Sequence, residues 1–248
     1  MPKVVLVTGG GRGIGAATAK LLAKRGYDVA VNYQSNITAA GKVVREIEGM
    51  GRRALAIQGD VAKEAHVVRM MSAVEERLGP LYGLVNNAGI TGRIGRLDDA
   101  SAETLQSTMD INVVGALLCA REAVKRMSTK HGGAGGVIVN VSSVATTLGS
   151  PNTYVWYAAS KGAVDAMTLG LGLEVAKEGI RVVGVAAGLT DTDLHAAGGE
   201  PNRARAIGPQ VPLGRAAQPA DIAEAIVWLM SDDARYCTAT TLRVGGGR

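Results

Sequence analysis

Tyr157 and Lys161 lie four residues apart, and their side-chain types could transfer a proton. We predict a helix over 154–177, which places both side chains on one helix face. A nearby ammonium favours a phenolate, so it would lower the pKa of the phenol from its usual value of about 10. Tyr157 is thus a candidate general acid for reduction and general base for oxidation. Alone, such a pair is more often a surface pair, so its surroundings decide.

Ser142 and Ser143 end an apolar run, 137–141, that we predict to be a strand preceding this helix. A hydroxyl at a strand end can hold a carbonyl oxygen on which negative charge develops during hydride transfer. The two serines therefore supply the second part of a carbonyl-reducing site.

A glycine-rich segment, Thr8-Gly9-Gly10-Gly11-Arg12-Gly13-Ile14-Gly15, joins the first predicted strand to the first predicted helix. A turn of this kind lets a pyrophosphate approach the backbone at a helix N-terminus. NAD sites usually place a carboxylate after the second strand, but 31–36 contains none, and Asn32 and Tyr33 stand there instead. Arg12 could meet a 2′-phosphate or be a solvated loop charge. We expect NADP(H), with NAD(H) as the alternative.

Strand-like and helix-like segments alternate along the chain. The predicted strands are 4–7, 29–31, 54–57, 84–85, 137–141, 180–185 and 240–244, and the predicted helices are 14–22, 38–49, 64–78, 102–127, 154–177 and 221–230. This alternation predicts an α/β fold with a doubly wound parallel sheet covered by helices on both faces, in a single domain over 1–248. Ligands bind such sheets beyond the carboxyl ends of the strands.

The composition fits a buried parallel sheet and excludes several other classes of protein. Hydrophobic residues make up 47% of the 248 residues, Phe is absent, and the net charge of +5 comes without a run of like charge. We therefore expect a small anionic ligand rather than nucleic acid. We also expect no membrane span, no metal site and a reduced cytoplasmic protein, in which Cys119 is a core residue.

Six motifs occur in the order in which short-chain dehydrogenases/reductases carry them, and they cover almost the whole chain. They are Thr8-Gly9-x-x-x-Gly13-x-Gly15, Asp60-Val61, Asn86-Asn87-Ala88-Gly89, Asn112, Ser142-Ser143 and Tyr157-x-x-x-Lys161. The chain resembles that family, and is similar to bacterial members named glucose 1-dehydrogenase or 3-oxoacyl-carrier-protein reductase. The resemblance implies a Rossmann fold of about seven strands and a nicotinamide-dependent oxidoreductase that interconverts a carbonyl and an alcohol.

The resemblance also implies individual roles. Ser143 would orient the substrate, Tyr157 would transfer the proton, and Lys161 would hold the nicotinamide ribose and lower the phenol pKa. Asn112 would anchor a water that relays protons through Lys161, or else mark a helix kink. The expected cofactor-binding residues are Gly9, Arg12, Gly13, Ile14, Gly15, Asn32, Tyr33, Asp60, Val61, Asn86, Ala88, Gly89, Tyr157, Lys161, Gly188 and Thr192, whereas Asn87 is expected to be structural.

The sequence departs from the family pattern at four places. Val183, Ala187 and Ala239 stand where asparagine, proline and glycine are usual, and one extra residue separates Ser143 from Tyr157. Ala187 would leave the backbone freer beneath the nicotinamide, at a cost of about 0.4–1 kcal/mol, without abolishing activity.

Substrate contacts are expected from two loops, 91–98 and 189–218. The second is long, so we predict a lid that closes over cofactor and substrate, in which His195 is a loop residue rather than a catalyst. The substrate is expected to be a small carbonyl or alcohol compound. The resemblance suggests a homotetramer that pairs the helices at 102–127 and 154–177. A non-catalytic dinucleotide-binding sensor or scaffold is the alternative outside enzymes.

Overall fold

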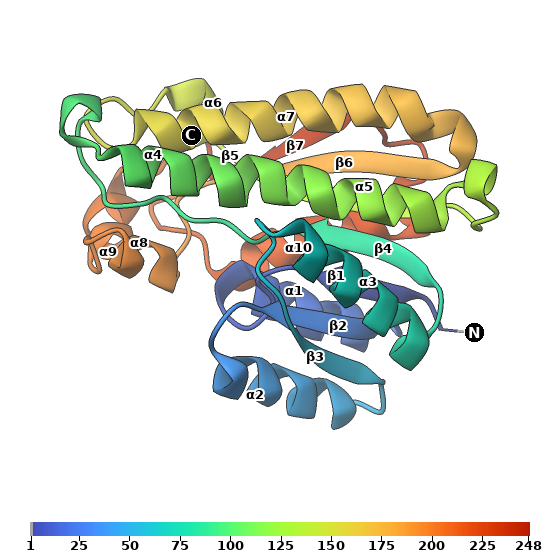
Figure 1. Cartoon of the computed structure of the whole chain (residues 1–248). Coiled ribbons are helices and arrows are strands. Elements are labelled where there is room, and N and C mark those ends of the chain that lie inside the picture. Colours follow the sequence, from blue (N-terminus) through green and yellow to red (C-terminus); the bar gives the residue numbers. More distant parts are fainter. Residues whose placement is uncertain (1) are drawn as a thin grey trace.

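A seven-stranded parallel sheet forms the centre of the protein, as described by a computed structural model for residues 2–248 (Figure 1). The strands lie in the order β3-β2-β1-β4-β5-β6-β7. Their bounds are β1 Val4–Val7, β2 Asp28–Tyr33, β3 Ala54–Gln58, β4 Leu81–Asn86, β5 Gly136–Ser143, β6 Ile180–Ala187 and β7 Thr240–Val244. The order reverses direction between β1 and β4, which is the switch point where such sheets bind ligands. The predicted doubly wound Rossmann-type sheet is confirmed.

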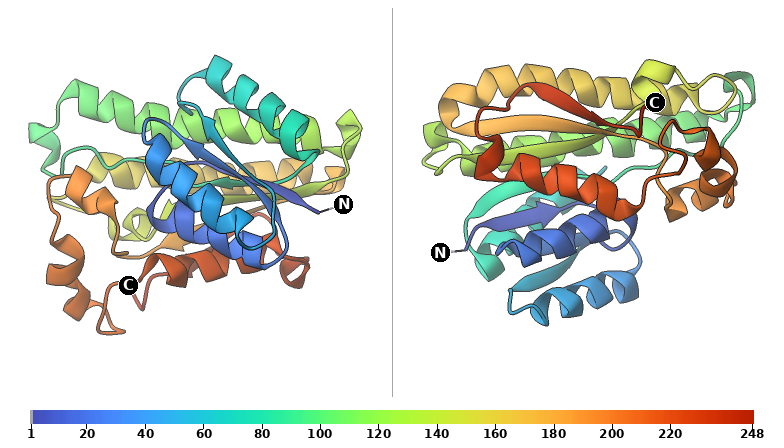
Figure 2. Two further views of the ribbon diagram at one scale, coloured as in Figure 1. Left: turned by 90° about the horizontal axis from the view of Figure 1, so that it is seen from below. Right: turned by 180° about the vertical axis from the view of Figure 1, so that it is seen from behind.

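Helices cover both faces of the sheet, and Figure 2 shows the two layers from below and from behind. The long helices are α1 Gly13–Lys24, α2 Ile37–Glu48, α3 Glu64–Leu78, α5 Gly115–Met127, α7 Val155–Val175 and α10 Pro219–Met230. The shorter ones are α4 Ala102–Met109, α6 Ala145–Leu148, α8 Asp193–Ala197 and α9 Arg203–Ile207. Single turns of 3₁₀ helix cover Leu97–Asp99, Thr129–His131, Ala176–Glu178, Gly208–Gln210 and Asp232–Ala234.

The strands read as continuous apolar runs because both of their faces are buried. In β1, Val5 and Val7 pack into a core with α1, α2 and α10, whereas Val4 and Leu6 pack into a second core with α3 and α5. All four side chains are at most 1% exposed. Two apolar layers thus fix the sheet from both sides and hold the ends of the strands in place.

The helix predicted over 102–127 is continuous in course but changes type in its middle. Between α4 and α5, the segment Asp110–Val114 forms a turn of π-helix that contains Asn112. A π turn widens the helix by one residue and is frequent at functional sites. The prediction of one uninterrupted α-helix was therefore wrong at this turn.

Three departures from the family pattern have structural consequences. Val183 is fully buried in the core of β6. Ala239 adopts a left-handed φ of 54° and packs against Gly172, where an added Cβ would meet the Ala239 Cα at 2.7 Å. The extra residue between Ser143 and Tyr157 falls in a segment where two more non-glycine residues, Ser150 and Asn152, are left-handed.

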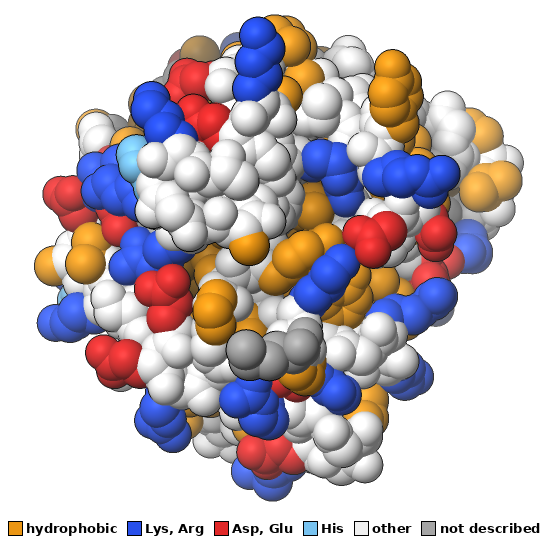
Figure 3. All heavy atoms as spheres, turned by 90° about the vertical axis from the view of Figure 1, so that its right-hand side faces the viewer, with side chains coloured by type: hydrophobic (Ala, Val, Ile, Leu, Met, Phe, Trp, Pro, Cys, Tyr) orange, Lys and Arg blue, Asp and Glu red, His pale blue; other side chains and the backbone are white. Residues whose placement is uncertain are grey.

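Charged side chains of both signs lie on the outer surface of the protein (Figure 3). On the face in Figure 3, basic and acidic side chains are intermixed rather than gathered by sign. None of the helices within 2–248 is both long and apolar enough to cross a bilayer. Cys119 is a fully buried core residue, as predicted, and its burial raises the pKa of the thiol to about 12.

Candidate active site

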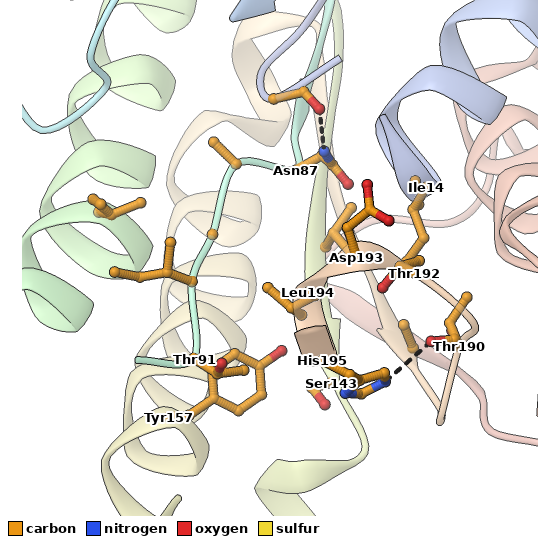
Figure 4. A pocket seen from close by; sticks show the side chains of 18 of the residues that line it. Ile14, Asn87, Thr91, Ser143, Tyr157, Thr190, Thr192, Asp193, Leu194 and His195 are labelled. Carbon is orange, nitrogen blue, oxygen red and sulfur yellow. Dashed lines mark hydrogen bonds between the residues drawn. The ribbon is translucent and has the colours of Figure 1, made fainter. Parts of the chain in front are cut away.

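A cavity of about 680 Å³ lies along the carboxyl edge of the sheet (Figure 4). Its walls come from the segments that follow β1 to β6, together with α7, α8 and α9. Of the residues predicted to bind cofactor, those that line it are Gly9, Arg12, Gly13, Ile14, Asn32, Tyr33, Asp60, Val61, Ala88, Gly89, Tyr157, Lys161, Gly188 and Thr192. Ser143 lines it as well. The fold therefore brings residues from distant parts of the sequence to one site.

The glycine loop is fixed by two asparagine side chains. Asn32 Oδ1 accepts a hydrogen bond from the Gly9 amide at 3.1 Å, and Asn32 Nδ2 donates to the Gly59 carbonyl at 3.0 Å. Asn87 Nδ2 donates to the Thr8 carbonyl at 2.9 Å. Gly13, which begins α1, has a left-handed φ of 52°, a conformation in which glycine carries no steric cost. The loop is thus held open toward the cavity before any ligand binds.

Two predicted cofactor-binding residues do not line the cavity. Asn86 is buried and its amide donates to the Ala116 carbonyl at 3.1 Å and to Asn140 Oδ1 at 3.0 Å, so it joins strands instead. Gly15 packs inside the loop, where an added Cβ would lie 2.5 Å from the Gly9 carbonyl oxygen. Its role is close packing. Conversely, Asn87, which we expected to be structural only, both holds the loop and lines the cavity.

Tyr157 and Lys161 come from the first turns of α7, and Ser143 is the last residue of β5. All three line the cavity, and Figure 4 shows the side chains of Tyr157 and Ser143 in its wall. Lys161 Nζ lies 5.8 Å from the Tyr157 ring centroid and donates a hydrogen bond to the Val141 carbonyl at 2.8 Å. The spacing of the residues on α7 therefore brings phenol and ammonium together as predicted.

The expected lowering of the Tyr157 pKa is not what the structure gives. Burial raises the pKa of the phenol well above its ordinary value, the nearby Tyr154 adds to this, and Ser143 opposes it. Burial also lowers the pKa of Lys161 to about 8. Desolvation disfavours the charged form of each group and is the largest cause of both shifts. Tyr157 is consequently a protonated phenol at neutral pH, which suits a proton donor.

Asn112 lies behind the cavity wall rather than in it. Its Oδ1 accepts from the Ile90 amide at 2.8 Å, while its Nδ2 donates to the Ile90 carbonyl at 2.8 Å and to Ser160 Oγ at 2.9 Å. An added Cβ on Gly89 would come within 3.1 Å of Asn112 Oδ1 and 3.5 Å of Lys161 Nζ. The π turn thus ties the segment after β4 to α7 beside Lys161.

Ala187 is held on both sides in the folded chain. Its carbonyl accepts from the Val144 amide at 3.0 Å, and the adjacent Gly188 amide donates to the Val244 carbonyl at 2.9 Å. The neighbouring strands supply the rigidity that a proline ring would otherwise give.

Several lining residues escaped sequence reasoning because only the fold brings them to the site. Tyr154 packs edge-on against Tyr157, with ring centroids 5.1 Å apart. Trp156 lies behind the lining, and its Nε1 donates to the carbonyl of the lining residue Thr91 at 2.7 Å. Arg203 and His195 reach the cavity from α9 and α8. Only their place in the long loop over 189–218 could have indicated them.

No cluster of His, Cys, Asp and Glu side chains that could hold a metal ion occurs within residues 2–248.

Comparison with known proteins agrees with this geometry. The family model described as enoyl-(acyl carrier protein) reductase matches residues 9–248. The "Uncharacterized oxidoreductase YgfF" of Escherichia coli (strain K12) is 51% identical over 245 residues, covering 99% of each chain. A 3-oxoacyl-[acyl-carrier-protein] reductase of Staphylococcus aureus is 38% identical and covers 100% of this chain and 98% of its own length.

Solved structures give the same assignment. A short chain dehydrogenase from Burkholderia cenocepacia in complex with NADP superimposes with a TM-score of 0.90 at 36% identity, covering 99% of this chain and 97% of that one. A 3-ketoacyl-(acyl-carrier-protein) reductase from Brucella melitensis complexed with NADH gives 0.91 at 33% identity, covering 99% and 98%. The chain belongs to the short-chain dehydrogenase/reductase family and is an oxidoreductase of that family.

Proposed function

We propose that this protein is an NADP(H)-dependent oxidoreductase that interconverts a carbonyl and an alcohol, with Tyr157 as the general acid/base. The observation that carries the proposal is that Ser143, Tyr157 and Lys161 border the same cavity as the glycine loop. A non-catalytic sensor would need the loop but not the phenol and the strand-end hydroxyl. The relative named as a 3-oxoacyl reductase supports a keto group as the reacting centre.

Each of the three side chains has a distinct task in reduction. Ser143 donates a hydrogen bond to the carbonyl oxygen and orients it, and Tyr157 gives its phenolic proton to that oxygen as negative charge develops. Lys161 supplies positive charge that stabilises the phenolate left behind. The bound nicotinamide supplies the hydride for the carbonyl carbon. Oxidation uses the same groups in reverse, with Tyr157 accepting the proton.

The cavity residues fit a dinucleotide. The glycine loop offers a left-handed Gly13 beside Thr192, and an added Cβ on Gly13 would come within 3.3 Å of the Thr192 methyl group, so the space there suits backbone approach only. The described residues give Arg12 no ion-pair partner, and it borders the end of β2, where no carboxylate stands. Its free guanidinium favours a 2′-phosphate. The NADP-bound neighbour supports this choice, whereas the NADH-bound one keeps NAD(H) as the alternative.

Asn112 acts in this proposal as a positioning residue, because its hydrogen bonds fix the backbone beside Lys161. Other lining residues that we assign to cofactor binding are Asp60, Val61, Ala88, Gly89 and Gly188. The segment 189–218 supplies α8 and α9 to the cavity wall, which supports its role as a lid. If it closes over the cofactor, NADPH protects it from limited proteolysis.

A homotetramer is supported by exposed apolar side chains on α5 and α7. Leu117, Leu169 and Leu173 are 49%, 53% and 68% exposed in the single chain. Burial of such side chains between subunits would stabilise an assembly by roughly 25 cal/mol per Å² of apolar area. Sedimentation of the purified protein measures the assembly directly.

The test of the proposed function is hydride transfer. Purified protein is titrated with NADPH and with NADH by following nicotinamide fluorescence, and then supplied with 4-deuterated NADPH and a panel of ketones. We expect tighter binding of NADPH and transfer of deuterium to the carbonyl carbon of at least one ketone. Preference for NADH would refute the cofactor assignment only. Binding without any transfer would favour the sensor.

A further inference from the structure

Arg203 and Tyr157, the proposed proton-transfer residue, both pack against the ring of Tyr154. The Arg203 guanidinium carbon is 5.5 Å from the centroid of the Tyr154 ring, and that ring packs edge-on against Tyr157 at 5.1 Å. All three side chains line the cavity. Arg203 therefore places a cation in the same cavity as Tyr157, two side chains away from it.

The hydrogen bonds of Arg203 leave part of its guanidinium without an acceptor. Nη1 donates to the Glu200 carboxylate, but Nε is buried and finds no partner anywhere in residues 2–248. The side chain is only 15% exposed, so water does not replace the missing partner at Nε. An unpaired buried donor on a charged group is unfavourable. Nη2, unlike Nε, is not closed off and has no hydrogen-bond partner within residues 2–248, so a carboxylate in the cavity can bind the guanidinium there.

His195, which also lines the cavity, has a buried ring nitrogen without a hydrogen-bond partner within residues 2–248. Its Nε2 lies 3.1 Å from the Thr190 carbonyl oxygen, and since a carbonyl only accepts, Nε2 carries the proton. Nδ1 is then an acceptor, and it is buried without a partner among the described residues. Burial, reinforced by the charge of Arg203, lowers the pKa of this imidazole, so it is neutral at pH 7. It therefore leaves the positive charge on this wall to Arg203.

Cationic side chains outnumber anionic ones in the cavity, and Arg203 and Arg248 are the two that the proposed function leaves unassigned. The cationic side chains that line it are Arg12, Lys161, Arg203 and Arg248, and the anionic ones are Asp60 and Asp193. Glu200, the carboxylate that pairs with Arg203, is 45% exposed, so solvent screens its opposition to a bound anion.

From these contacts we propose that the substrate carries a carboxylate held by Arg203, in addition to the carbonyl at Tyr157: the enzyme interconverts a small oxo acid and the corresponding hydroxy acid. The inference rests on the proposed function and specifies its substrate class. In reduction the carbonyl carbon receives the hydride of NADPH and its oxygen receives the Tyr157 proton, which solvent then replaces. The carboxylate is unchanged, and NADP⁺ is the oxidised product.

The test compares acids with their esters, because the two differ only in the charge that Arg203 would bind. Reduction of 3-oxobutanoate and 4-oxopentanoate by NADPH is measured beside that of their methyl esters, in wild-type protein and in Arg203→Gln, Arg203→Lys and Arg205→Gln. Arg205 is a matched control because it lies on the same helix, is exposed and does not line the cavity.

We expect the wild-type enzyme to prefer an acid over its ester. Arg203→Gln should lower the acid-to-ester ratio of kcat/KM by about 10- to 100-fold, the range for loss of a charged hydrogen bond. Arg203→Lys should fall between, because lysine keeps the charge but not the planar pair of donors. Arg205→Gln should leave the ratio unchanged. A purely structural role for Arg203 would lower turnover of acid and ester alike and keep their ratio.

Calorimetric binding of 4-oxopentanoate to protein saturated with NADP⁺ separates this inference from the proposed function. Binding that needs Arg203, without reduction of any acid or ester, would support the carboxylate site and refute the oxidoreductase proposal. Reduction of esters and acids with a ratio that Arg203→Gln does not alter would refute the carboxylate site alone. Absence of both binding and reduction would overturn both.

Discussion

Replacement of Lys161 by methionine should stabilise the protein while removing its activity. Lys161 is a buried ammonium, and burial lowers its pKa from 10.5 to about 8, so at pH 7 it is still charged. At about 1.36 kcal/mol per pKa unit, this difference makes the charged form unfavourable by roughly 3 kcal/mol. A methionine of similar length carries no such penalty.

The gain in the free energy of unfolding of Lys161→Met is smaller than that penalty because the variant loses one hydrogen bond. Lys161 Nζ donates to the Val141 carbonyl at 2.8 Å, and losing this bond offsets about 1–2 kcal/mol. We therefore expect Lys161→Met to raise the free energy of unfolding at pH 7 by about 1–2 kcal/mol. For a chain of this size, that corresponds to a rise of about 2–6 °C in Tm.

The pH dependence of stability tests independently whether Lys161→Met is stabilising. Between pH 8 and 10.5 the unfolded chain keeps the Lys161 proton and the folded chain releases it, so wild-type stability rises relative to the variant. The advantage of Lys161→Met should therefore be complete below pH 8, vanish at about pH 9–9.5 and reverse toward pH 10.5, because wild-type stability rises by about 1.36 kcal/mol per pH unit in this range. Urea unfolding of the cofactor-free proteins measures it, with Lys130→Met, an exposed lysine, as the control. A variant less stable than wild type at pH 7 would refute the reasoning.

Three further predictions concern backbone and cofactor. Ala239→Gly should raise Tm by about 1–4 °C, because a left-handed alanine costs about 1–2 kcal/mol and the unfolded-state entropy of glycine offsets part of that gain. A lower Tm would show that the backbone at Ala239 is not strained. Gly15→Ala should lower the free energy of unfolding by about 1–3 kcal/mol and weaken NADPH binding, since its Cβ would lie 2.5 Å from the Gly9 carbonyl oxygen. The control Gly162→Ala, whose Cβ would meet nothing within 4 Å, should lose no stability in the same thermal unfolding experiment. Arg12→Ser should weaken NADPH binding by about tenfold and leave NADH binding unchanged in fluorescence titrations; equal losses would count against a 2′-phosphate contact.

Local patterns predicted most of the fold. Apolar runs such as 4–7 and 180–185 mark strands buried on both faces, and their alternation with helical segments specifies a doubly wound sheet. The π turn around Asn112 was not predictable because its residues carry ordinary helical periodicity. It depends on the hydrogen bonds of Asn112 to Ile90 and Ser160, which exist only after the helix docks.

The candidate site was predictable where chemistry and spacing are local, as for Tyr157 and Lys161. Asn86 and Asn87 show the limit of that approach. They are adjacent and alike, yet strand alternation turns Asn86 toward Asn140 and leaves Asn87 at the strand end beside Thr8. The direction of the Tyr157 pKa shift also escaped prediction, because its largest cause is burial by the whole fold.

The most direct test of the account is Tyr157→Phe, measured on the ketone that the wild-type enzyme reduces fastest. Phenylalanine keeps the ring that packs against Tyr154 and removes only the hydroxyl. NADPH binding should be unchanged, and kcat should fall by about 10²- to 10⁴-fold, the usual contribution of a general acid. A variant that binds NADPH and keeps most of its turnover would contradict the assignment of Tyr157 as the proton donor.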